Sequence, residues 1–438
     1  MSPEEKFVHD LQRSQWLSGA EISALQRPLL ERLVRHAATQ TDFYPERLAP
    51  LFTGADPASA AIDLSRWDEV PILSRAEIGE HASDMMARTL PRASGSYVVR
   101  RSSGTTTRPL EFRRSALARG VAGCQLHRLY ELYDFDFTGV FAHITHDAAG
   151  NSSYPLGLRS KRWNFAAADA DLLTLEIRTP AADQLVWLER VKPDYVMTYA
   201  NNMRAVAEIA LARGDSTYRF EYFIATGEIL DKAAQELIVR AFDCRVLDIY
   251  GAREIGPIAF RCPDGEAYHL CDETVHCELL DDGGRPVSPG EYGRVVVTPL
   301  YEFAMPFIRY DLGDYAKRSP APCSCGRGLG SLEAIAGRSR NLFVMPDGSK
   351  YWPPLGPISK SLTKFLSYRQ VQFVQTGVDM LEIKYVPEVA AAKPDAVAIT
   401  ELLRAEFHPR LNVLLVPVER IERGAGMKLE QFISRVAI

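Results

Sequence analysis

The sequence predicts an α/β fold in two parts: a large N-terminal domain with layered helices, mostly parallel sheets and a β subdomain, and a small α+β C-terminal domain. Between about residues 97 and 251, short apolar runs alternate with amphipathic segments, as they do where helices pack on a parallel sheet. Between about 257 and 330, strand-like runs alternate with glycine- and proline-rich turns. The remaining tail carries enough helix and strand patterns to fold separately. We therefore expect a large domain at 1–337 and a small domain at 338–438.

The first 90 residues predict helices joined by loops. The segment LQRPLLERLVRHAA carries apolar residues at helical spacing, so one face of it can be buried. We expect this region to cap the main body.

The central elements follow in regular order. Five runs predict strands and four longer segments between them predict helices: strands at 97–100, 140–145, 194–199, 220–226 and 245–251, and helices at 115–133, 184–191, 203–214 and 231–242. Such alternation favours strands that run in the same direction, because each helix returns the chain to the start of the next strand.

The later elements have a different pattern. CELLDDGGRPVSPGEYGRVVVTPL predicts a hairpin around a turn rich in glycine and proline. In the tail, ISKSLTKFL and ITELLRAEF predict helices, QVQFVQTG and MLEIKYVP paired strands, and NVLLVPV another strand. We expect a final basic helix after these elements.

Composition excludes several partners. The apolar content of 46% and the charged content of 24% are ordinary for a soluble protein, and the net charge of −5 gives no reason to propose nucleic acid or an anionic membrane as partner. No apolar run approaches the roughly 18 residues that span a bilayer, and the N-terminus lacks a basic start followed by an apolar core. We expect a cytoplasmic protein whose partners are small molecules.

The run RRSSGTTTRPLEF places hydroxyls and a glycine directly after a predicted strand. Backbone amides and hydroxyls of such a loop can converge on phosphate oxygens. The run does not match the Walker pattern, because no GK[ST] follows and the next segment predicts a strand. The alternative is a polar hairpin turn.

Three further segments carry candidate site residues. DIYGAREIG ends a predicted strand with Tyr250, which could stack on a purine, and Glu254, which could hold magnesium. FIRYDLGDYA places Asp314 at a turn, where it could accept hydrogen bonds from ribose hydroxyls. GRSRN lies at the predicted domain boundary. Each segment alone could be an ordinary turn.

In this order and spacing the motifs resemble the adenylate-forming superfamily, and most closely its phenylacetate-CoA ligase branch. The family's SSGTTGKP, YGxTE, RYRTGD and GRSDD motifs and its late lysine correspond here to SSGTTTRP, YGAREI, RYDLGD, GRSRN and GMK. The resemblance covers about residues 95 to 438.

The resemblance implies an enzyme that uses ATP and Mg²⁺ to convert a carboxylic acid into an acyl-AMP, and then transfers the acyl group to CoA. It assigns the nucleotide to Ser102, Ser103, Gly104, Thr105, Thr106, Thr107, Gly227, Glu228, Tyr250, Gly251 and Asp314. It assigns catalysis to Lys428, to Glu254 as the magnesium ligand, and to Arg338 beside the hinge. In the family the small domain rotates about this hinge between the two half-reactions.

The resemblance also places the acid substrate at His146, Tyr199, Ala225, Ile255 and Gly256. It implies an aromatic or other compact, planar acid, and members of this branch are often homodimers. The sequence does not name the acid.

The sequence departs from the family pattern at several positions. Thr107 and Arg108 replace Gly-Lys, Arg253 replaces a threonine, and Arg340 replaces an aspartate. The segment after the hinge also departs from the family pattern. This departure concerns the use of CoA more than the use of ATP. Two alternatives to a CoA ligase stay open: an adenylating enzyme that passes the acyl group to an amine or a carrier protein, and an inactive nucleotide- and zinc-binding protein.

Five of the seven cysteines fall between residues 262 and 325, in the predicted β subdomain. Four residues could form a structural zinc site of the Cys₃His type: Cys262, His269, Cys323 and Cys325. Cys271, His276 and Cys277 compete as ligands. The alternative is a set of reduced structural cysteines. Some phenylacetate-CoA ligase-like proteins resemble this arrangement and hold a structural zinc.

Overall fold

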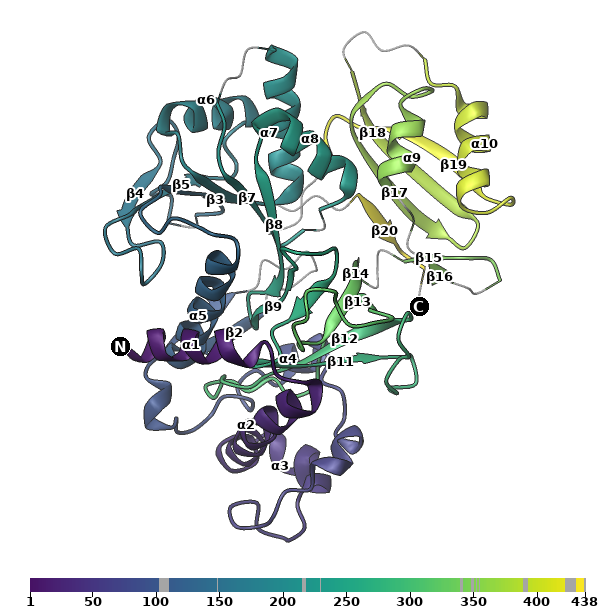
Figure 1. Ribbon diagram of the computed structural model, residues 1–438. Helices are drawn as coiled ribbons and strands as arrows, with labels where there is room; N and C mark the ends of the chain where they lie inside the picture. Colours follow the sequence, from purple (N-terminus) through teal and green to yellow (C-terminus); the bar gives the residue numbers. More distant parts are fainter. Residues whose placement is uncertain are drawn as a thin grey trace.

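The computed structural model (Figure 1) describes almost all of the chain. The described residues are 1–101, 110–147, 149–214, 218–228, 230–338, 342–347, 350–351, 353, 355–388, 393–421 and 431–436. The predicted phosphate loop, Ser102 to Thr107, and the predicted catalytic Lys428 lie outside them.

The N-terminal region is helical, as the sequence predicts. Its helices are α1 (Pro3–Ser14), α2 (Gly19–Gln40), α3 (Tyr44–Leu48) and α4 (Arg75–Glu80), with short 3₁₀ turns at Ala49–Leu51, Leu64–Glu69 and Arg92–Ser94. Capping boxes begin α1, α2 and α4, because Ser2, Ser18 and Ser74 each accept a hydrogen bond from the backbone N–H three residues later. Leu33 and Val34 of α2 are fully buried in one core with residues of the sheet, so this region caps the main body.

The main body is a mixed sheet of twelve described strands in the order β11-β12-β13-β14-β10-β9-β8-β7-β6-β3-β5-β4. Its parallel part consists of β5 (Asp171–Glu176), β3 (Phe141–Thr145), β6 (Tyr195–Thr198), β7 (Tyr222–Thr226) and β8 (Arg245–Ala252). Helix α5 (Ala116–Leu132) packs on one face of these strands. Helices α6 (Ala181–Val191), α7 (Ala200–Arg213) and α8 (Lys232–Phe242) pack on the other. This confirms the predicted layered α/β architecture.

The antiparallel part continues the same sheet. It contains β9 (Gly256–Arg261), β10 (Tyr268–Leu270), β11 (Val275–Leu280), β12 (Tyr292–Pro299), β13 (Tyr310–Arg318) and β14 (Ser331–Arg338). Strands β11 and β12 form the predicted hairpin. A separate hairpin of β1 (Tyr97–Arg101) and β2 (Glu111–Ser115) flanks the predicted phosphate loop. The edge strand β4 (Leu158–Lys161), antiparallel to β5, is not anticipated by the sequence pattern, and neither is β5.

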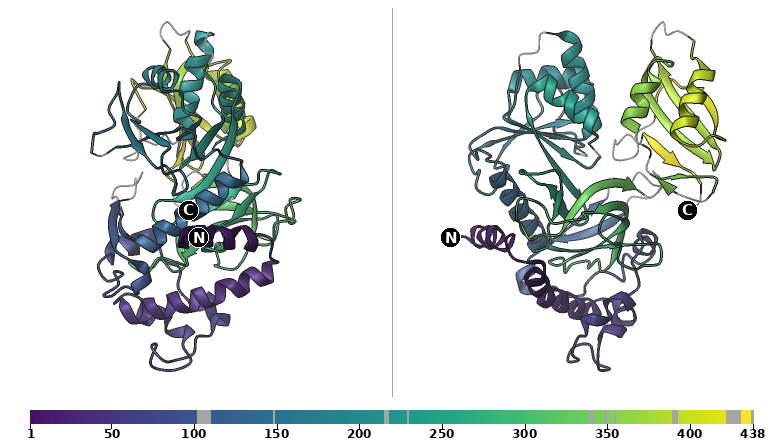
Figure 2. Two further views of the ribbon diagram at one scale, coloured as in Figure 1. Left: turned by 60° about the vertical axis from the view of Figure 1, so that its left-hand side comes forward. Right: turned by 45° about the vertical axis from the view of Figure 1, so that its right-hand side comes forward.

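The C-terminal segment has its own sheet and its own core (Figures 1 and 2). Strands β17 (Tyr368–Gly377) and β18 (Met380–Pro387) pair antiparallel, and β19 (Asn412–Pro417) and β20 (Phe432–Ser434) add parallel edges. Helices α9 (Leu355–Leu362) and α10 (Ala396–Glu406) supply residues to its core, and β15 (Phe343–Val344) pairs with β16 (Lys350–Tyr351).

The predicted final basic helix is wrong where the chain is described, since Phe432–Ser434 forms strand β20. Tertiary packing overrides the local pattern there: Phe432 is buried in the C-terminal core, and the backbone N–H of Phe373 donates to the carbonyl of Gln431 at 2.7 Å. Among the described helices, none combines the length and apolar character that a bilayer crossing requires.

Candidate active site and candidate metal centre

Most of the predicted site residues follow the carboxyl ends of neighbouring parallel strands. His146 follows β3, Tyr199 follows β6, Gly227 and Glu228 follow β7, and Glu254 follows β8. Because these strands are parallel and adjacent, their carboxyl ends meet at one edge of the sheet. Open α/β sheets bind their ligands at this edge.

Two glycines shape the turn between β8 and β9 that carries Glu254. A Cβ atom at Gly251 would lie 2.5 Å from the carbonyl oxygen of Gly256, which is closer than real Cβ atoms come to any atom. Gly256 has a φ of +100°, a conformation that other residues rarely adopt. The turn therefore depends on glycine at both positions, which the sequence predicted as site residues.

Glu254 is buried and lies between a hydroxyl and a guanidinium. The Tyr310 hydroxyl is 3.3 Å from Glu254 Oε1, and Arg75 Nη1 of α4 lies 3.7 Å from the same oxygen. A carboxylate that follows a strand end is suited to a hard divalent cation. No local sequence signal identifies Arg75 as a neighbour of the site.

Tyr250, Asp314 and Arg338 come together from distant parts of the sheet. The Tyr250 hydroxyl donates to Asp314 Oδ2 at 2.8 Å, although three strands separate β8 from β13 in the sheet order. Asp314 is paired in register with Arg338 of β14. The structure thus places Tyr250 beside Asp314, and Asp314 lies in the strand next to β14, which ends at the predicted hinge.

A buried ion pair lies beside the turn between β8 and β9. Arg114 Nε of β2 is 3.4 Å from Glu302 Oε2, both side chains are buried, and Glu302 accepts hydrogen bonds from the backbone N–H groups of Ser115 and Ala304. Arg114 Nη1 also donates to the carbonyl of Arg253 at 3.3 Å, which fixes the β8–β9 turn. Neither residue is predicted by the sequence pattern, because a buried ion pair between distant segments leaves no periodic signal.

The predicted acid-binding residues do not all lie in one place. Tyr199 is buried, and this burial raises the pKa of its hydroxyl, while the charge of Arg253 opposes the rise. Ile255 is buried beside the turn, and Ala225 is fully buried in the core that β7 shares with α6–α8. His146 contacts Glu176 of β5, with 3.5 Å between Nδ1 and Oε1. The structure therefore brings Tyr199 close to the turn and pairs His146 on the far side of β3.

Glu228 is also held at this edge. Its Oε2 accepts a hydrogen bond from the backbone N–H of Asn201 at 3.0 Å, in the first turn of α7. Gly227 has a φ of +73°, so the chain turns sharply as it leaves β7. The carboxylate is positioned by the positive end of a helix.

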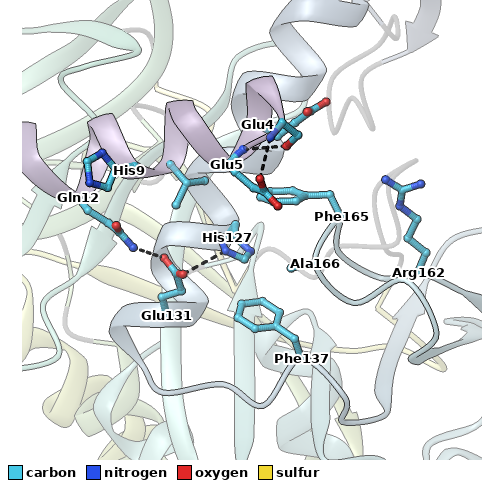
Figure 3. A pocket seen from close by; sticks show the side chains of 12 residues that line it. Glu4, Glu5, His9, Gln12, His127, Glu131, Phe137, Arg162, Phe165 and Ala166 are labelled. Carbon is cyan, nitrogen blue, oxygen red and sulfur yellow. Dashed lines mark hydrogen bonds and ion pairs between the residues drawn. The ribbon is translucent and has the colours of Figure 1, made fainter.

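A cavity lies elsewhere in the large domain (Figure 3). It measures about 540 Å³ and is lined by α1, α5 and residues 162–166. The His127 ring is stacked on Phe137 at 4.5 Å between centroids, and its Nε2 is 3.2 Å from Glu131 Oε1. Because Phe137 precedes β3, this cavity faces the amino ends of the parallel strands, opposite the candidate active site.

The four residues predicted as zinc ligands converge. One ligand atom from each of Cys262, His269, Cys323 and Cys325 lies within 4.8 Å of the others. The Cys262 and Cys323 sulfurs are 3.8 Å apart, and Cys325 Sγ is 3.2 Å from His269 Nε2. Two thiolates bound to one tetrahedral zinc at about 2.3 Å would be separated by about 3.8 Å. The donor set and the sulfur spacing therefore fit zinc.

The residues that competed for this site lie elsewhere. Cys271 is buried in the core between α5 and the sheet, Cys277 lies in β11, and His276 Nδ1 is 2.8 Å from Gln26 Oε1. All seven cysteines are free thiols.

Arg327 connects the four ligands to the N-terminal helices. Its backbone N–H donates to Cys325 Sγ at 3.5 Å, and its Nε donates to Gln15 Oε1 at 2.9 Å. Burial raises the pKa of the Cys325 thiol, but hydrogen bonds from Arg327 and the neighbouring sulfurs outweigh it and hold that pKa below its usual value. The lowering does not extend to the whole cluster, because burial raises the pKa of the Cys262 thiol to about 12.

Comparison with known proteins agrees with the geometry. No protein-family model matches the chain. It is 24% identical over 387 residues to the phenylacetate-coenzyme A ligase of Thermus thermophilus, an alignment that covers 83% of this chain and 81% of the relative. It is 27% identical over 163 residues to the phenylacetate-coenzyme A ligase of Escherichia coli, covering 35% of this chain and 36% of that relative.

Among solved structures, 2-hydroxyisobutyryl-CoA ligase in the postadenylation state is similar with a TM-score of 0.73 at 18% identity, over 97% of this chain and 91% of that chain. The fold is that of the adenylate-forming ligases. A benzoate CoA ligase from Burkholderia xenovorans is similar with a TM-score of 0.53 at 16% identity, over 78% of this chain and 69% of that chain. The adenylate-forming ligase fold predicted from the motifs is therefore confirmed.

Proposed function

We propose that this chain is an AMP-forming acid–CoA ligase: it activates a carboxylic acid as an acyl-AMP and then transfers the acyl group to CoA. The observation that carries the proposal is the group of Glu254, Tyr250 and Asp314 at the carboxyl edge of the parallel strands. The similarity to phenylacetate-coenzyme A ligase along most of both chains supports the same reaction class.

In this proposal, each residue at the edge has one task. Asp314 accepts hydrogen bonds from the ribose hydroxyls, and Tyr250, held by Asp314, flanks the adenine. Glu254 supplies the carboxylate oxygen for Mg²⁺, which would neutralise phosphate charge during attack by the carboxylate. Gly227 and Glu228 line the adenine pocket, and the loop Ser102 to Thr107 binds the phosphates.

We further propose that the segment after Arg338 rotates as a small domain between the half-reactions. It has its own sheet and core, which a rigid-body rotation requires. The chain matches 2-hydroxyisobutyryl-CoA ligase with a TM-score of 0.73 in the postadenylation state and 0.61 in the thioesterification state. Lys428, predicted to contact the reacting carboxylate and the α-phosphate, belongs to this segment.

The four-ligand cluster of Cys262, His269, Cys323 and Cys325 is proposed to hold one structural zinc. Four protein ligands leave no open coordination position, so the metal would stabilise the fold without taking part in the reaction. We keep an aromatic acid and a homodimer as predictions, the latter testable by sedimentation. We also keep a cytoplasmic location as a prediction.

The deciding experiment is acid-dependent exchange of pyrophosphate into ATP, followed by AMP release with and without CoA. The proposal expects exchange with at least one acid and CoA-dependent AMP release. Exchange without CoA-dependent release would favour transfer to an amine or a carrier protein. Absence of exchange with every aryl and alkyl acid would contradict adenylation.

A second arm uses Lys428→Ala with Lys364→Ala as its matched control on the same segment. We expect Lys428→Ala to lose exchange by at least about a hundred-fold, since this lysine would stabilise charge that develops in the transition state. Both variants should retain the unfolding temperature of the parent. Unchanged exchange in Lys428→Ala would remove this lysine from the mechanism.

A further inference from the structure

The cavity at the amino ends of the parallel strands is built by segments that are distant in the sequence (Figure 3). Its walls come from α1, from the last turns of α5, and from residues 162–166 in the loop that connects β4 to β5. Helix α1 packs on α5 through Val8 and Leu11, which share a small core with Cys124. The walls are therefore held together by side-chain packing between these segments.

Two phenylalanine rings form the apolar wall of the cavity. The His127 ring packs against both, with its centroid 4.5 Å from that of Phe137 and 4.4 Å from that of Phe165. His127 is fixed, because its Nδ1 lies 2.9 Å from Asn164 Oδ1 and its Nε2 lies 3.2 Å from Glu131 Oε1. Phe137 and Phe165 remain partly exposed, so their rings are available to an apolar group in the cavity.

One side of the cavity is acidic. Glu131 of α5 lines it together with Glu4 and Glu5 of α1. Gln12 Nε2 donates to Glu131 Oε2 at 2.6 Å, so this carboxylate is held at the junction of the two helices. A carboxylate at a fixed position beside aromatic rings is suited to an ammonium group.

The other side of the cavity carries a guanidinium. Arg162 lines the cavity from the loop after β4, and in Figure 3 it lies across Phe165 from Glu131. The neighbouring Lys161 pairs with Asp171, whereas none of the ion pairs among the described residues includes Arg162. A guanidinium presents a planar set of N–H donors that matches a carboxylate.

The size of the cavity fits a small molecule. It measures about 540 Å³, and small-molecule sites in proteins span about 300–1,000 Å³. A ligand that satisfies the acidic side, the guanidinium and the apolar wall at once carries an ammonium group, a carboxylate and an aromatic body. An aromatic amino acid has these three parts.

We propose that this cavity is a second small-molecule site and that it binds an aromatic amino acid as its zwitterion. The ammonium group contacts Glu131, the carboxylate contacts Arg162, and the ring packs on Phe137 and Phe165. The cavity lies at the opposite edge of the sheet from the candidate active site, so this ligand is distinct from the acid that is adenylated. Its occupant connects α1, α5 and the loop at 162–166.

The test measures binding to the full chain by calorimetry without ATP, so its outcome does not depend on the proposed function. The probes are L-phenylalanine, L-tryptophan and two analogues of L-phenylalanine: phenethylamine, which lacks the carboxylate, and 3-phenylpropanoate, which lacks the amine. We expect L-phenylalanine to bind at least about tenfold more tightly than either analogue, as for the loss of one charge-assisted hydrogen bond.

Two variants assign each end of the ligand. Glu131→Gln should weaken L-phenylalanine and phenethylamine at least about tenfold while leaving 3-phenylpropanoate within about twofold. Arg162→Gln should weaken L-phenylalanine and 3-phenylpropanoate at least about tenfold while leaving phenethylamine within about twofold. The matched control is Arg159→Gln, which removes an exposed guanidinium of β4 that does not line the cavity and should leave all affinities unchanged.

Three outcomes would overturn the inference. One is no binding of either amino acid to the parent up to about 10 mM. Another is an analogue that binds as tightly as L-phenylalanine, which would show that one charged side takes no part. The third is binding that neither cavity variant weakens by more than about twofold, which would place the ligand elsewhere. If Glu131→Gln fails to fold, the exposed Arg162→Gln decides the last point alone.

Discussion

The strand-edge site, formed by Tyr250, Glu254 and Asp314, and the four-ligand cluster lie in the same sheet but differ in how their polar groups are satisfied. In the cluster the four ligand atoms face one another within 4.8 Å, and Arg327 ties them to Gln15. At the edge, Glu254 lies 3.7 Å from Arg75, whereas the Arg253 side chain is exposed and no described carboxylate lies at ion-pair distance from it. A closed set of donors suits a structural ion, whereas an open edge suits a ligand that comes and goes. The variants below test this division.

The largest expected effect is loss of the metal. Cys323→Ser removes one of the four ligands, and since metal binding is coupled to folding, we expect zinc content to fall from one per chain toward zero. The unfolding temperature should fall by about 10 °C or more, as expected for a loss of several kcal/mol. Elemental analysis and calorimetry measure both. Freshly purified parent protein without zinc would refute the site.

The second effect concerns chemistry rather than stability. Glu254→Gln keeps the shape of the side chain but removes the charge that would hold Mg²⁺, so exchange should fall by about a hundred-fold or more. The zinc content and unfolding temperature should stay near those of the parent. A variant that exchanges normally would exclude Glu254 as the magnesium ligand.

A smaller effect is expected for the ribose contact. Asp314→Ala should raise the KM for ATP by about 10- to 100-fold, because it removes a charged hydrogen-bond acceptor. Tyr250→Phe removes only the hydroxyl that donates to Asp314, so its KM for ATP should rise less than about tenfold. Steady-state kinetics at saturating acid separates the two. A larger effect for Tyr250→Phe would contradict the assigned roles.

The smallest effect is expected at a cysteine outside the cluster. Cys271→Ala removes a buried sulfur from the core and should cost about 1–2 kcal/mol of unfolding free energy, with zinc content unchanged. This variant is the matched control for Cys323→Ser. Loss of zinc in Cys271→Ala would show that the competing ligand set was the right one.

Sequence periodicity identified most of the elements because their apolar residues follow helix or strand spacing. It missed β4, whose four residues are all exposed and so carry no apolar alternation. It also placed a helix where Phe432–Ser434 forms β20, because burial of Phe432 against β17 depends on residues some sixty positions earlier in the chain. Local pattern is informative only where local burial decides the structure.

The residues of the candidate site also show that local sequence patterns miss contacts between distant segments. Short motifs located Tyr250 and Glu254 at the end of β8. They also located Asp314, but the predicted turn there is wrong, because Asp314 lies within strand β13 and pairs in register with β14. They did not locate Arg75, Arg114 or Glu302, whose contacts join segments far apart in the chain.

By itself the sequence determined the α/β class, the order of the motifs, and the residue types that could bind a nucleotide or a metal ion. Its cysteine spacing left seven candidate ligands open. Only the tertiary structure decided that Cys262, His269, Cys323 and Cys325 meet, because β10 brings His269 beside loops sixty residues apart. The same holds for Glu254: its identity is local, but its contacts with Arg75 and Tyr310 join segments far apart in the chain, and such contacts are a property of the whole fold.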